Sequence, residues 1–366
     1  MRIVRIELHV IEMALKTPFV TSLGTVRNRS GIIIEATDEN GVTGYGEAVA
    51  FSTPWYTEET TQTCFHLLKD ILAPLVINHQ FTRPEELHKR MAEIRKNPMA
   101  KAAIDMAVWD LYAKTLNKPL HLVIGGTRKT VLAGISIGAS TVEQLLEQTN
   151  AALKDGYSRI KIKIAPGRDL DRIRAIREAF PELSVLADAN SAYIDHEKEL
   201  SALDDYGLQM IEQPLSQDDF IDHAGLQKRL KTPICLDESI TSFHSAKTAV
   251  ELKSCRVINL KIGRVGGLTE AIKIHDLCLE HGIQVWCGGM LEFGISRAHN
   301  VALATLEGFT IPGDISSSER YWEEDITLPD VKVKDGVITP FKGPGIGVSL
   351  NRKRLEQVRK HYELLE

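Results

Sequence analysis

Short apolar stretches recur through the middle of the chain, and most of them end in a charged residue. Five such ends, at Lys163, Asp188, Glu212, Asp237 and Lys261, follow one another at steps of 24 or 25 residues. A short buried strand, a crossover helix and two loops need about that length. The pattern therefore predicts a β/α barrel whose polar residues stand at the carboxyl ends of successive strands, where such barrels carry out chemistry.

The predicted barrel covers residues 126–318 and is a modified TIM barrel of the (β/α)7β kind. Its first strand is expected at 131–137 and its last strands at 284–287 and 309–311, where apolar runs stand between turn residues. Residues 160–164 alternate isoleucine with lysine, so Lys161 and Lys163 share one face of the second strand.

Residues 1–125 lack the barrel period and predict an α+β capping domain. Alternating stretches at 3–13, 31–36 and 42–47 favour strands, and Asn40-Gly41 between the last two is a strong hairpin signal. The helices predicted to follow cover 58–75, 84–96 and 98–117. Residues 319–366 show short strands and a terminal helix over 352–365, and we expect this segment to return to the cap.

Two loops of the cap are candidates for a lid over the barrel mouth. One spans 17–25 and the other 51–56, and each combines aromatic residues with glycine, serine or proline. Mobile loops of this kind can exclude water from a reactive site. Phe19, Phe51 and Trp55 are the side chains that we expect to face the substrate.

Composition narrows the classes of function. The chain is 43% hydrophobic and 25% charged with a net charge of −5, which favours a globular protein without a nucleic-acid-binding surface. We expect no membrane partner, because no apolar run reaches the length of a span and no signal-peptide pattern is visible. Five cysteines without a CxxC pair favour free thiols in a reducing compartment, so a cytoplasmic protein is expected.

The three acids at strand ends predict a metal site. Strand ends converge in a closed barrel, so Asp188, Glu212 and Asp237 can point at one spot, where their mutual repulsion calls for a divalent cation. An all-oxygen ligand set favours Mg²⁺, with Mn²⁺ as an alternative, over Zn²⁺. In the competing interpretation, each acid is an isolated carboxylate that caps a helix or lies in a loop. That interpretation explains a single acid well, but it explains three acids at this regular spacing poorly.

The lysines flank the acids. Lys163 on strand two and Lys261 on strand six stand four strands apart in a barrel of eight, so we expect them to face each other across the metal. A dication and a second ammonium nearby would lower the pKa of a buried lysine toward that of a usable base, and Lys161 would add to this effect or hold an anionic substrate oxygen. The alternative, in which Lys161 and Lys163 simply meet solvent, leaves the mirrored position of Lys261 unexplained. A metal and two opposed bases suit removal of a proton α to a carboxylate through an enediolate.

Several motifs carry a resemblance to a known family. They are Lys-x-Lys at 161–163, Asp-Ala-Asn at 188–190, Ile-Glu-Gln-Pro at 211–214, Leu-Asp-Glu-Ser at 236–239 and Leu-Lys-x-Gly-Arg-Val-Gly-Gly at 260–267. Together they resemble the muconate-cycloisomerase subgroup of the enolase superfamily, over essentially the whole chain. The segments 53–59, 286–292 and 312–316 are similar to o-succinylbenzoate synthases of the N-succinylamino acid racemase type.

The resemblance implies a Mg²⁺-dependent lyase or racemase acting on a small carboxylate, in a homo-oligomer. Asp188, Glu212 and Asp237 would bind the metal, and Lys163 and Lys261 would be catalytic. The implied reactions are dehydration of a succinyl-hydroxycyclohexadiene carboxylate in menaquinone biosynthesis and racemisation of N-succinylamino acids. Arg264 would tune Lys261, with an ordinary surface arginine as the alternative. The expected substrate neighbours are Asn190, Ser136, Gly288, Gly289 and Met290.

Other activities are weighed against this one. Dipeptide epimerases of the superfamily are expected to carry Asp-x-Asp after the last strand, whereas residues 314–316 offer only Asp314. An inactive barrel with a binding role is expected to lack a ligand or a lysine, and none is missing. A zinc hydrolase is disfavoured because the twelve histidines form no HxH or HxxxH at a strand end. The choice between synthase and racemase stays open, as does the pocket shape near Phe293, where relatives often have threonine.

Overall fold

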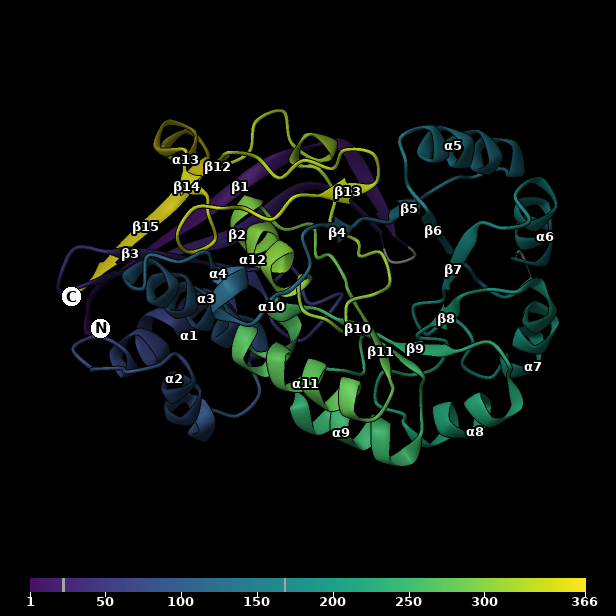
Figure 1. Ribbon diagram of the computed structural model, residues 1–366, viewed down its shortest axis with the longest axis horizontal. Coiled ribbons are helices and arrows are strands. Elements are labelled where there is room, and N and C mark those ends of the chain that lie inside the picture. Colours follow the sequence, from purple (N-terminus) through teal and green to yellow (C-terminus); the bar gives the residue numbers. More distant parts are fainter. Residues whose placement is uncertain (22–23, 168) are drawn as a thin grey trace.

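Seven parallel strands form the curled sheet that carries the candidate site (Figure 1). The computed structural model describes residues 1–21, 24–167 and 169–366, and there the strands lie in the order β11-β10-β9-β8-β7-β6-β5. Their bounds are β5 (Ile135–Ile137), β6 (Arg159–Lys163), β7 (Ser184–Asp188), β8 (Met210–Glu212), β9 (Ile234–Leu236), β10 (Val257–Leu260) and β11 (Gln284–Cys287). Lys163 pairs with Asp188, and Asp188 with Glu212, so the polar strand ends meet at one edge.

The strands are buried on both faces, as the apolar runs predict. One side of the sheet encloses a small inner core, made of Leu186, Met210, Cys235, Val257, Trp286 and Ile311. The other side is covered by an outer row of helices (Figure 1). These are α5 (Val142–Lys154), α6 (Asp169–Ala179), α7 (Glu197–Leu200), α8 (Ile221–Arg229), α9 (Phe243–Leu252) and α11 (Leu268–Glu280). The amphipathic α5 shows why they dock, because its buried residues Leu145, Thr149 and Ala152 fall on one helical face.

The two ends of the predicted barrel differ from expectation. The stretch 131–137 is not one strand, since β4 (Val131–Leu132) pairs with β13 (Val337–Ile338) before β5 begins. Ala133 and Gly134 separate the two strands, and a Cβ on Gly134 would clash with the guanidinium of Arg159. The predicted last strand at 309–311 is reduced to single bridges, from Phe309 to Val285 and from Gly313 to Ala133. These bridges still connect the two edges of the curled sheet.

The cap is an antiparallel sheet in the order β15-β1-β2-β3, packed against a long helix. Its strands are β1 (Ile3–Thr21), β2 (Gly24–Asp38), β3 (Thr43–Ala48) and β15 (Arg359–Leu365). The predicted turn at Asn40-Gly41 is present, and the backbone N–H of Asn40 donates to Asp38 there. Helix α3 (Pro98–Thr115) lies so close to β3 that a Cβ at Gly44 or Gly46 would clash with its backbone.

Three parts of the cap depart from the predicted elements. The loop expected at 17–25 is a continuation of β1 and β2, with Phe19 paired to Val26; residues 22 and 23 and the Phe19 side chain lie outside the described part. The helix expected at 58–75 is α1 (Thr61–Leu67) followed by π and 3-10 turns, and that at 84–96 shortens to α2 (Glu85–Arg90) with a 3-10 turn. The terminal helix stops as α13 (Arg352–Val358), because residues 359–365 form β15 and fill the hydrogen-bonding edge of β1.

Short elements complete the connections. They are α4 (Leu120–Val123), α10 (Ile262–Val265), α12 (Gly294–Leu303), β12 (Thr327–Leu328) and β14 (Ser349–Leu350).

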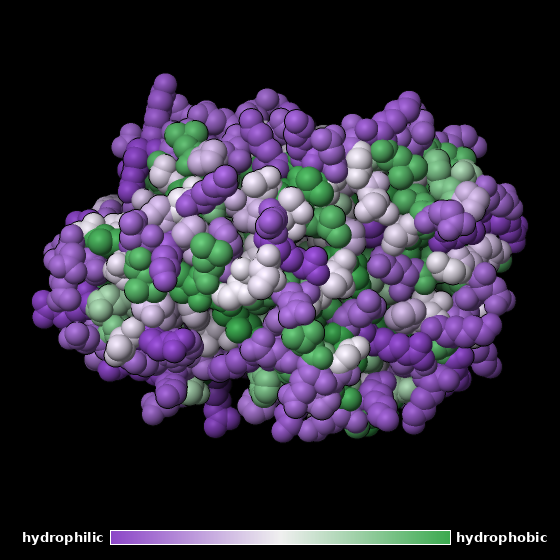
Figure 2. Space-filling model, in the orientation of Figure 1, coloured by the Kyte–Doolittle hydropathy of each residue, from purple (hydrophilic) through white to green (hydrophobic). Residues whose placement is uncertain are grey.

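Hydrophilic side chains dominate the face in Figure 2, and apolar ones are scattered among them. In the described ranges no helix has both the length and the apolar character needed to cross a bilayer. All five cysteines are free thiols, as predicted, and all five are buried.

Candidate active site

The three acids at the strand ends lie deep in the barrel mouth. Asp188 and Asp237 are each 2% exposed and Glu212 is fully buried. The ammonium of Lys161 lies 3.3 Å from both Asp188 and Glu212, so it bridges two of the acids from below. Burial, and after it the charge of Asp188, raises the pKa of Glu212 to about 8.

Lys163 approaches this group from β6. Its ammonium lies 2.6 Å from Asp188 and also donates to the side-chain oxygen of Asn190, while almost half of the lysine side chain is exposed. Burial would raise the pKa of Asp188, but Lys163 and Lys161 hold it below its ordinary value. Asn190 has a positive φ of 42° and donates in turn to Glu238 at 2.9 Å. The predicted neighbour Asn190 is therefore a direct partner of Lys163.

Lys261 approaches from the end of β10. Its ammonium lies 2.8 Å from Asp237 and donates to the hydroxyl of Tyr56, also at 2.8 Å. Arg264 is fully buried; it forms an ion pair with Asp237 and donates to Tyr56 at 3.0 Å. The surface alternative for Arg264 is therefore wrong. Among the described side chains, burial lowers the pKa of Lys261, but Asp237 and Tyr56 outweigh burial and raise it. The expected lowering depends on a bound dication and stays a prediction.

Tyr56 is a site residue that the sequence did not single out by itself. It belongs to the predicted lid segment 51–56, yet Phe51 is only 6% exposed and Trp55 is half-buried. The three aromatic rings pack on one another, with 4.5 Å between the centroids of Phe51 and Trp55 and 5.8 Å between Trp55 and Tyr56. Burial and the Asp237 carboxylate raise the pKa of Tyr56 to about 12, so its hydroxyl stays protonated.

Asp314 is a second residue whose role was missed. One of its oxygens lies 2.8 Å from Lys161 and the other 2.8 Å from Arg159, which is fully buried. The predicted neighbour Ser136 donates to the same carboxylate at 3.4 Å. Because two internal cations already neutralise Asp314, it has no free charge to hold a substrate ammonium.

The loop after β11 brings the predicted glycines to the site. A Cβ on Gly288 would lie 2.6 Å from Cε of Lys261, so only glycine leaves room for this lysine. Gly289 packs on the backbone of Asp314 in the same way. Met290 is 6% exposed and packs into the cap core. Phe293 is fully buried against Trp322, with 5.0 Å between ring centroids, so it belongs to the core between cap and barrel.

The acids have the donor set of a site for a hard cation. All candidate ligands are oxygens, and histidine and cysteine do not take part. Three buried oxygens at the site have no hydrogen-bond partner among the described residues: Asp188 Oδ1, Glu238 Oε2 and Asn259 Oδ1. Asn259 was not predicted; its amide donates to Glu212 at 2.7 Å and so orients that acid. Buried oxygens that lack donors are what a bound cation would satisfy.

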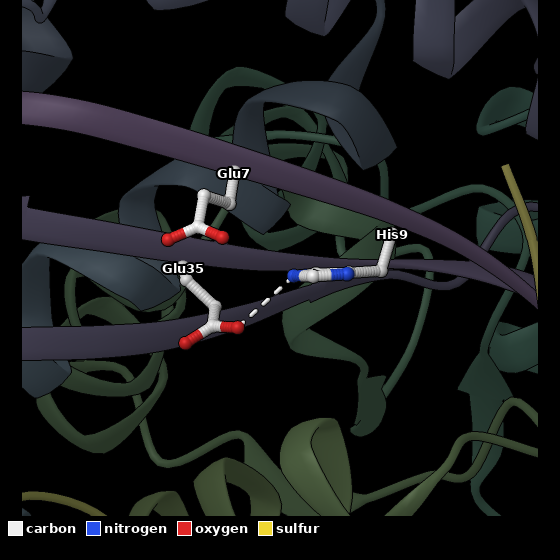
Figure 3. A group of neighbouring side chains, drawn as sticks. All are labelled: Glu7, His9 and Glu35. Carbon is white, nitrogen blue, oxygen red and sulfur yellow. Dashed lines mark hydrogen bonds and ion pairs between the residues drawn. The ribbon is translucent and has the colours of Figure 1, made fainter. Parts of the chain in front are cut away.

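A different acidic group lies in the cap sheet (Figure 3). Within the described ranges, Glu7, His9 and Glu35 are the one trio whose potential ligand atoms all lie within 4.8 Å of one another. The His9 ring lies 3.0 Å from Glu35, and Arg352 donates to both oxygens of that glutamate. The charge of Glu35 is thus already compensated, and the group ties the C-terminal segment to the cap.

Comparisons with known proteins agree with the family resemblance of the sequence motifs. Residues 5–125 match the family described as mandelate racemase / muconate lactonizing enzyme, N-terminal domain, and residues 144–354 match the family described as enolase C-terminal domain-like. An o-succinylbenzoate synthase of Geobacillus kaustophilus is 53% identical over 97% of this chain and 95% of its own length. An N-succinylamino acid racemase of Thermus thermophilus is 46% identical over 98% of this chain and 97% of its own. The crystal structure of an enolase-superfamily protein from Listeria innocua has a TM-score of 0.98 at 44% identity, over 100% of this chain and 99% of that one.

The fold and the site thus define a capped β/α-barrel enzyme of the enolase type. The chain belongs to the enolase superfamily, among relatives named o-succinylbenzoate synthase or N-succinylamino acid racemase. The resemblance stated from the motifs is confirmed. Enzymes of this superfamily depend on a metal ion.

Proposed function

We propose that this protein removes a proton α to a carboxylate, and that it acts as an o-succinylbenzoate synthase with N-succinylamino acid racemase activity. The observation that carries the proposal is the pair of ammonium groups on β6 and β10, with three strands between them, each held by a different acid of one buried group. The names of the relatives at 53% and 46% identity support both activities.

Asp188, Glu212 and Asp237 are proposed to hold Mg²⁺, with Mn²⁺ as a substitute. Their oxygen donors, and the unpartnered Oδ1 of Asp188, support this assignment. The ion would balance the negative charge that develops on the substrate carboxylate. Asn259 orients Glu212 by its hydrogen bond, and Lys161 and Asp314 fix the base of the site.

In the synthase reaction, Lys163 takes the α-proton and then returns it to the hydroxyl group that leaves as water. This step of menaquinone biosynthesis converts the succinyl-hydroxycyclohexadiene carboxylate into an aromatic product. Lys261 stays charged on the opposite face and stabilises the developing anion, an electrostatic role of the kind that oxyanion donors play. In racemisation, one lysine removes the α-proton and the other delivers a proton to the opposite face. Arg264 and Tyr56 hold Lys261 in place for both reactions.

The remaining assignments belong to the same proposal. The working units are a cap (1–125), a barrel (126–318) and a C-terminal segment (319–366) that returns to the cap. The segment 51–56 and the hairpin that contains Phe19 cover the barrel mouth, with Ser136, Asn190 and residues 288–290 beside the substrate. We place the enzyme in the cytoplasm, in keeping with its five free thiols, and expect a homo-oligomer, which sedimentation analysis would test.

The test supplies purified enzyme and Mg²⁺ with each substrate in turn. Formation of o-succinylbenzoate and racemisation of an N-succinylamino acid should both occur, and both should be lost in Lys163→Ala. Synthase activity alone would remove racemisation from the proposal. Absence of both reactions in folded, Mg²⁺-saturated protein would overturn it.

A further inference from the structure

A buried arginine joins the two parts of the cap that border the site. Arg29 lies in β2, opposite Met13, just before the pairing between β1 and β2 shifts register. Its side chain is 1% exposed and donates to the carbonyl oxygen of Ala50 at 2.8 Å, to that of Val49 and to that of Ser30. We call residues 25–30 the β2 arm and residues 49–56 the aromatic segment.

Arg29 supplies every described hydrogen bond between these two stretches. Regular pairing between β2 and β3 ends at Ile32 and Ala48, and beyond that pair the β2 arm and the aromatic segment diverge around a pocket of about 310 Å³. Without the guanidinium, the carbonyl of Val49 would lose its link to the β2 arm. The hydrogen bonds from Thr61 to Ala50 and Phe51 would remain, as would the packing of the segment in the cap core, but none of these reaches the β2 arm.

The arginine is also coupled to Tyr56. Its guanidinium carbon lies 4.4 Å from the centroid of the Phe51 ring, a cation–π contact. The centroid of Phe51 lies 6.2 Å from that of Tyr56, and the Tyr56 hydroxyl accepts from Lys261 at 2.8 Å. A continuous series of contacts therefore runs from Arg29 to the ammonium of Lys261.

A contribution to the stability of the fold does not by itself explain why an arginine is buried at this position. No carboxylate lies within ion-pair distance of it, and its Nε is buried without a partner among the described residues. Burial lowers the pKa of Arg29 to about 10, despite the charges of Glu47 and Glu292 nearby. A buried cation without an ion-pair partner is costly, and an apolar side chain of similar size would avoid that cost.

We propose that Arg29 is a positioning residue that holds the aromatic segment so that Tyr56 stays on Lys261, and that it thereby supports proton transfer at the Lys261 face. This inference rests on the proposed function, because it assumes that the two lysines serve opposite faces of the α-carbon. No described contact joins Arg29 to the three acids or to Lys163 or Lys261, so its proposed effect on Lys261 is indirect and passes through the aromatic segment.

The experiment measures exchange of the α-proton of each pure N-succinylamino acid enantiomer for deuterium, with Mg²⁺ present. The enantiomer that depends on Lys261 is identified first with Lys261→Ala. Arg29→Met should then slow exchange of that enantiomer by roughly tenfold or more and leave the other within about twofold, since loss of charge-assisted hydrogen bonds changes rates on that scale. Arg29→Lys, which keeps one cationic donor, should fall between the two.

Two controls separate positioning from general damage. Arg177 also binds backbone carbonyls, of Tyr206 at 2.9 Å and Pro181 at 2.7 Å, but near the amino ends of the strands. Arg177→Met should lower the melting temperature and leave the ratio of the two exchange rates unchanged. In a Tyr56→Phe background, Arg29→Met should cost less than about twofold, because the route to Lys261 is already broken.

The outcomes distinguish this inference from the proposed function. If the unmodified enzyme exchanges neither enantiomer, racemisation is removed from the proposed function and the positioning role of Arg29 fails with it; absence of the synthase reaction as well would overturn the proposed function. If it exchanges both, while Arg29→Met slows both equally or adds fully to Tyr56→Phe, the positioning role of Arg29 is wrong and the proposed function stands.

Discussion

The hydroxyl of Tyr56 gives the most detailed prediction. It accepts from Lys261 at 2.8 Å and from Arg264 at 3.0 Å, and it lies 3.5 Å from Asp237. Tyr56→Phe removes these contacts and keeps the ring that packs on Phe51 and Trp55. Hydrogen bonds to charged groups contribute about 1.5–3 kcal/mol, so steps that need an oriented Lys261 should slow by roughly 10- to 150-fold.

The assay compares kcat and KM for the synthase reaction with single-enantiomer deuterium exchange. The loss should fall on kcat and on the enantiomer served by Lys261, while the enantiomer served by Lys163 keeps its rate. The melting temperature should fall by only a few degrees, because ring packing is preserved and Asp237 still pairs with Lys261 and Arg264. Tyr112→Phe makes the same chemical change at a half-buried position in α3, away from the site, and should be silent. Equal losses for both enantiomers, or no loss at all, would refute the argument that Tyr56 acts through Lys261.

Three further predictions concern the metal, an ion-pair network and the effect of pH. Chelator-treated enzyme should be inactive and recover with Mg²⁺ or Mn²⁺, because the site offers carboxylates and no imidazole; recovery with Zn²⁺ alone would contradict this. Asp314→Asn leaves the buried cations Lys161 and Arg159 beside a neutral amide and should cost about 3–5 kcal/mol in unfolding free energy, whereas an unchanged denaturation midpoint would show that the pairs contribute nothing. Burial raises the pKa of Glu47 from 4.5 to about 8, against backbone donors and Arg29 and with the help of Glu292, so the folded state binds more protons than the unfolded state in this window. This group therefore makes stability fall as the pH rises, and Glu47→Gln should flatten the fall in melting temperature between about pH 5 and pH 8; an unaltered slope would count against it.

The regular part of the site could be predicted from the sequence because barrel geometry is periodic. A step of 24 or 25 residues places each polar strand end beside the next, and the pairing of Lys163 with Asp188 and of Asp188 with Glu212 follows from that step. The turn at Asn40-Gly41 could be predicted for a similar reason, since its chemistry is local.

The rest depends on contacts that no local pattern encodes. Tyr56 and Lys261 form a hydrogen bond although they are 205 residues apart in the sequence. The segment around Tyr56 has no regular spacing of apolar residues that would indicate which aromatic ring points into the site. Asp314 lies outside any regular strand, so only the folded chain shows that Lys161 and Arg159 neutralise it. Residues 359–365 have helical spacing, but the open edge of β1 selects a strand.

Proton exchange with each pure enantiomer of an N-succinylamino acid, followed by NMR in deuterated water, tests the central claim most directly. Lys163 and Lys261 are proposed to serve opposite faces of one α-carbon. Lys261→Ala should abolish racemisation while one enantiomer still exchanges through Lys163, and Lys163→Ala should spare the opposite enantiomer. Exchange of both enantiomers at equal rates by either single variant would show that the two lysines are not opposed.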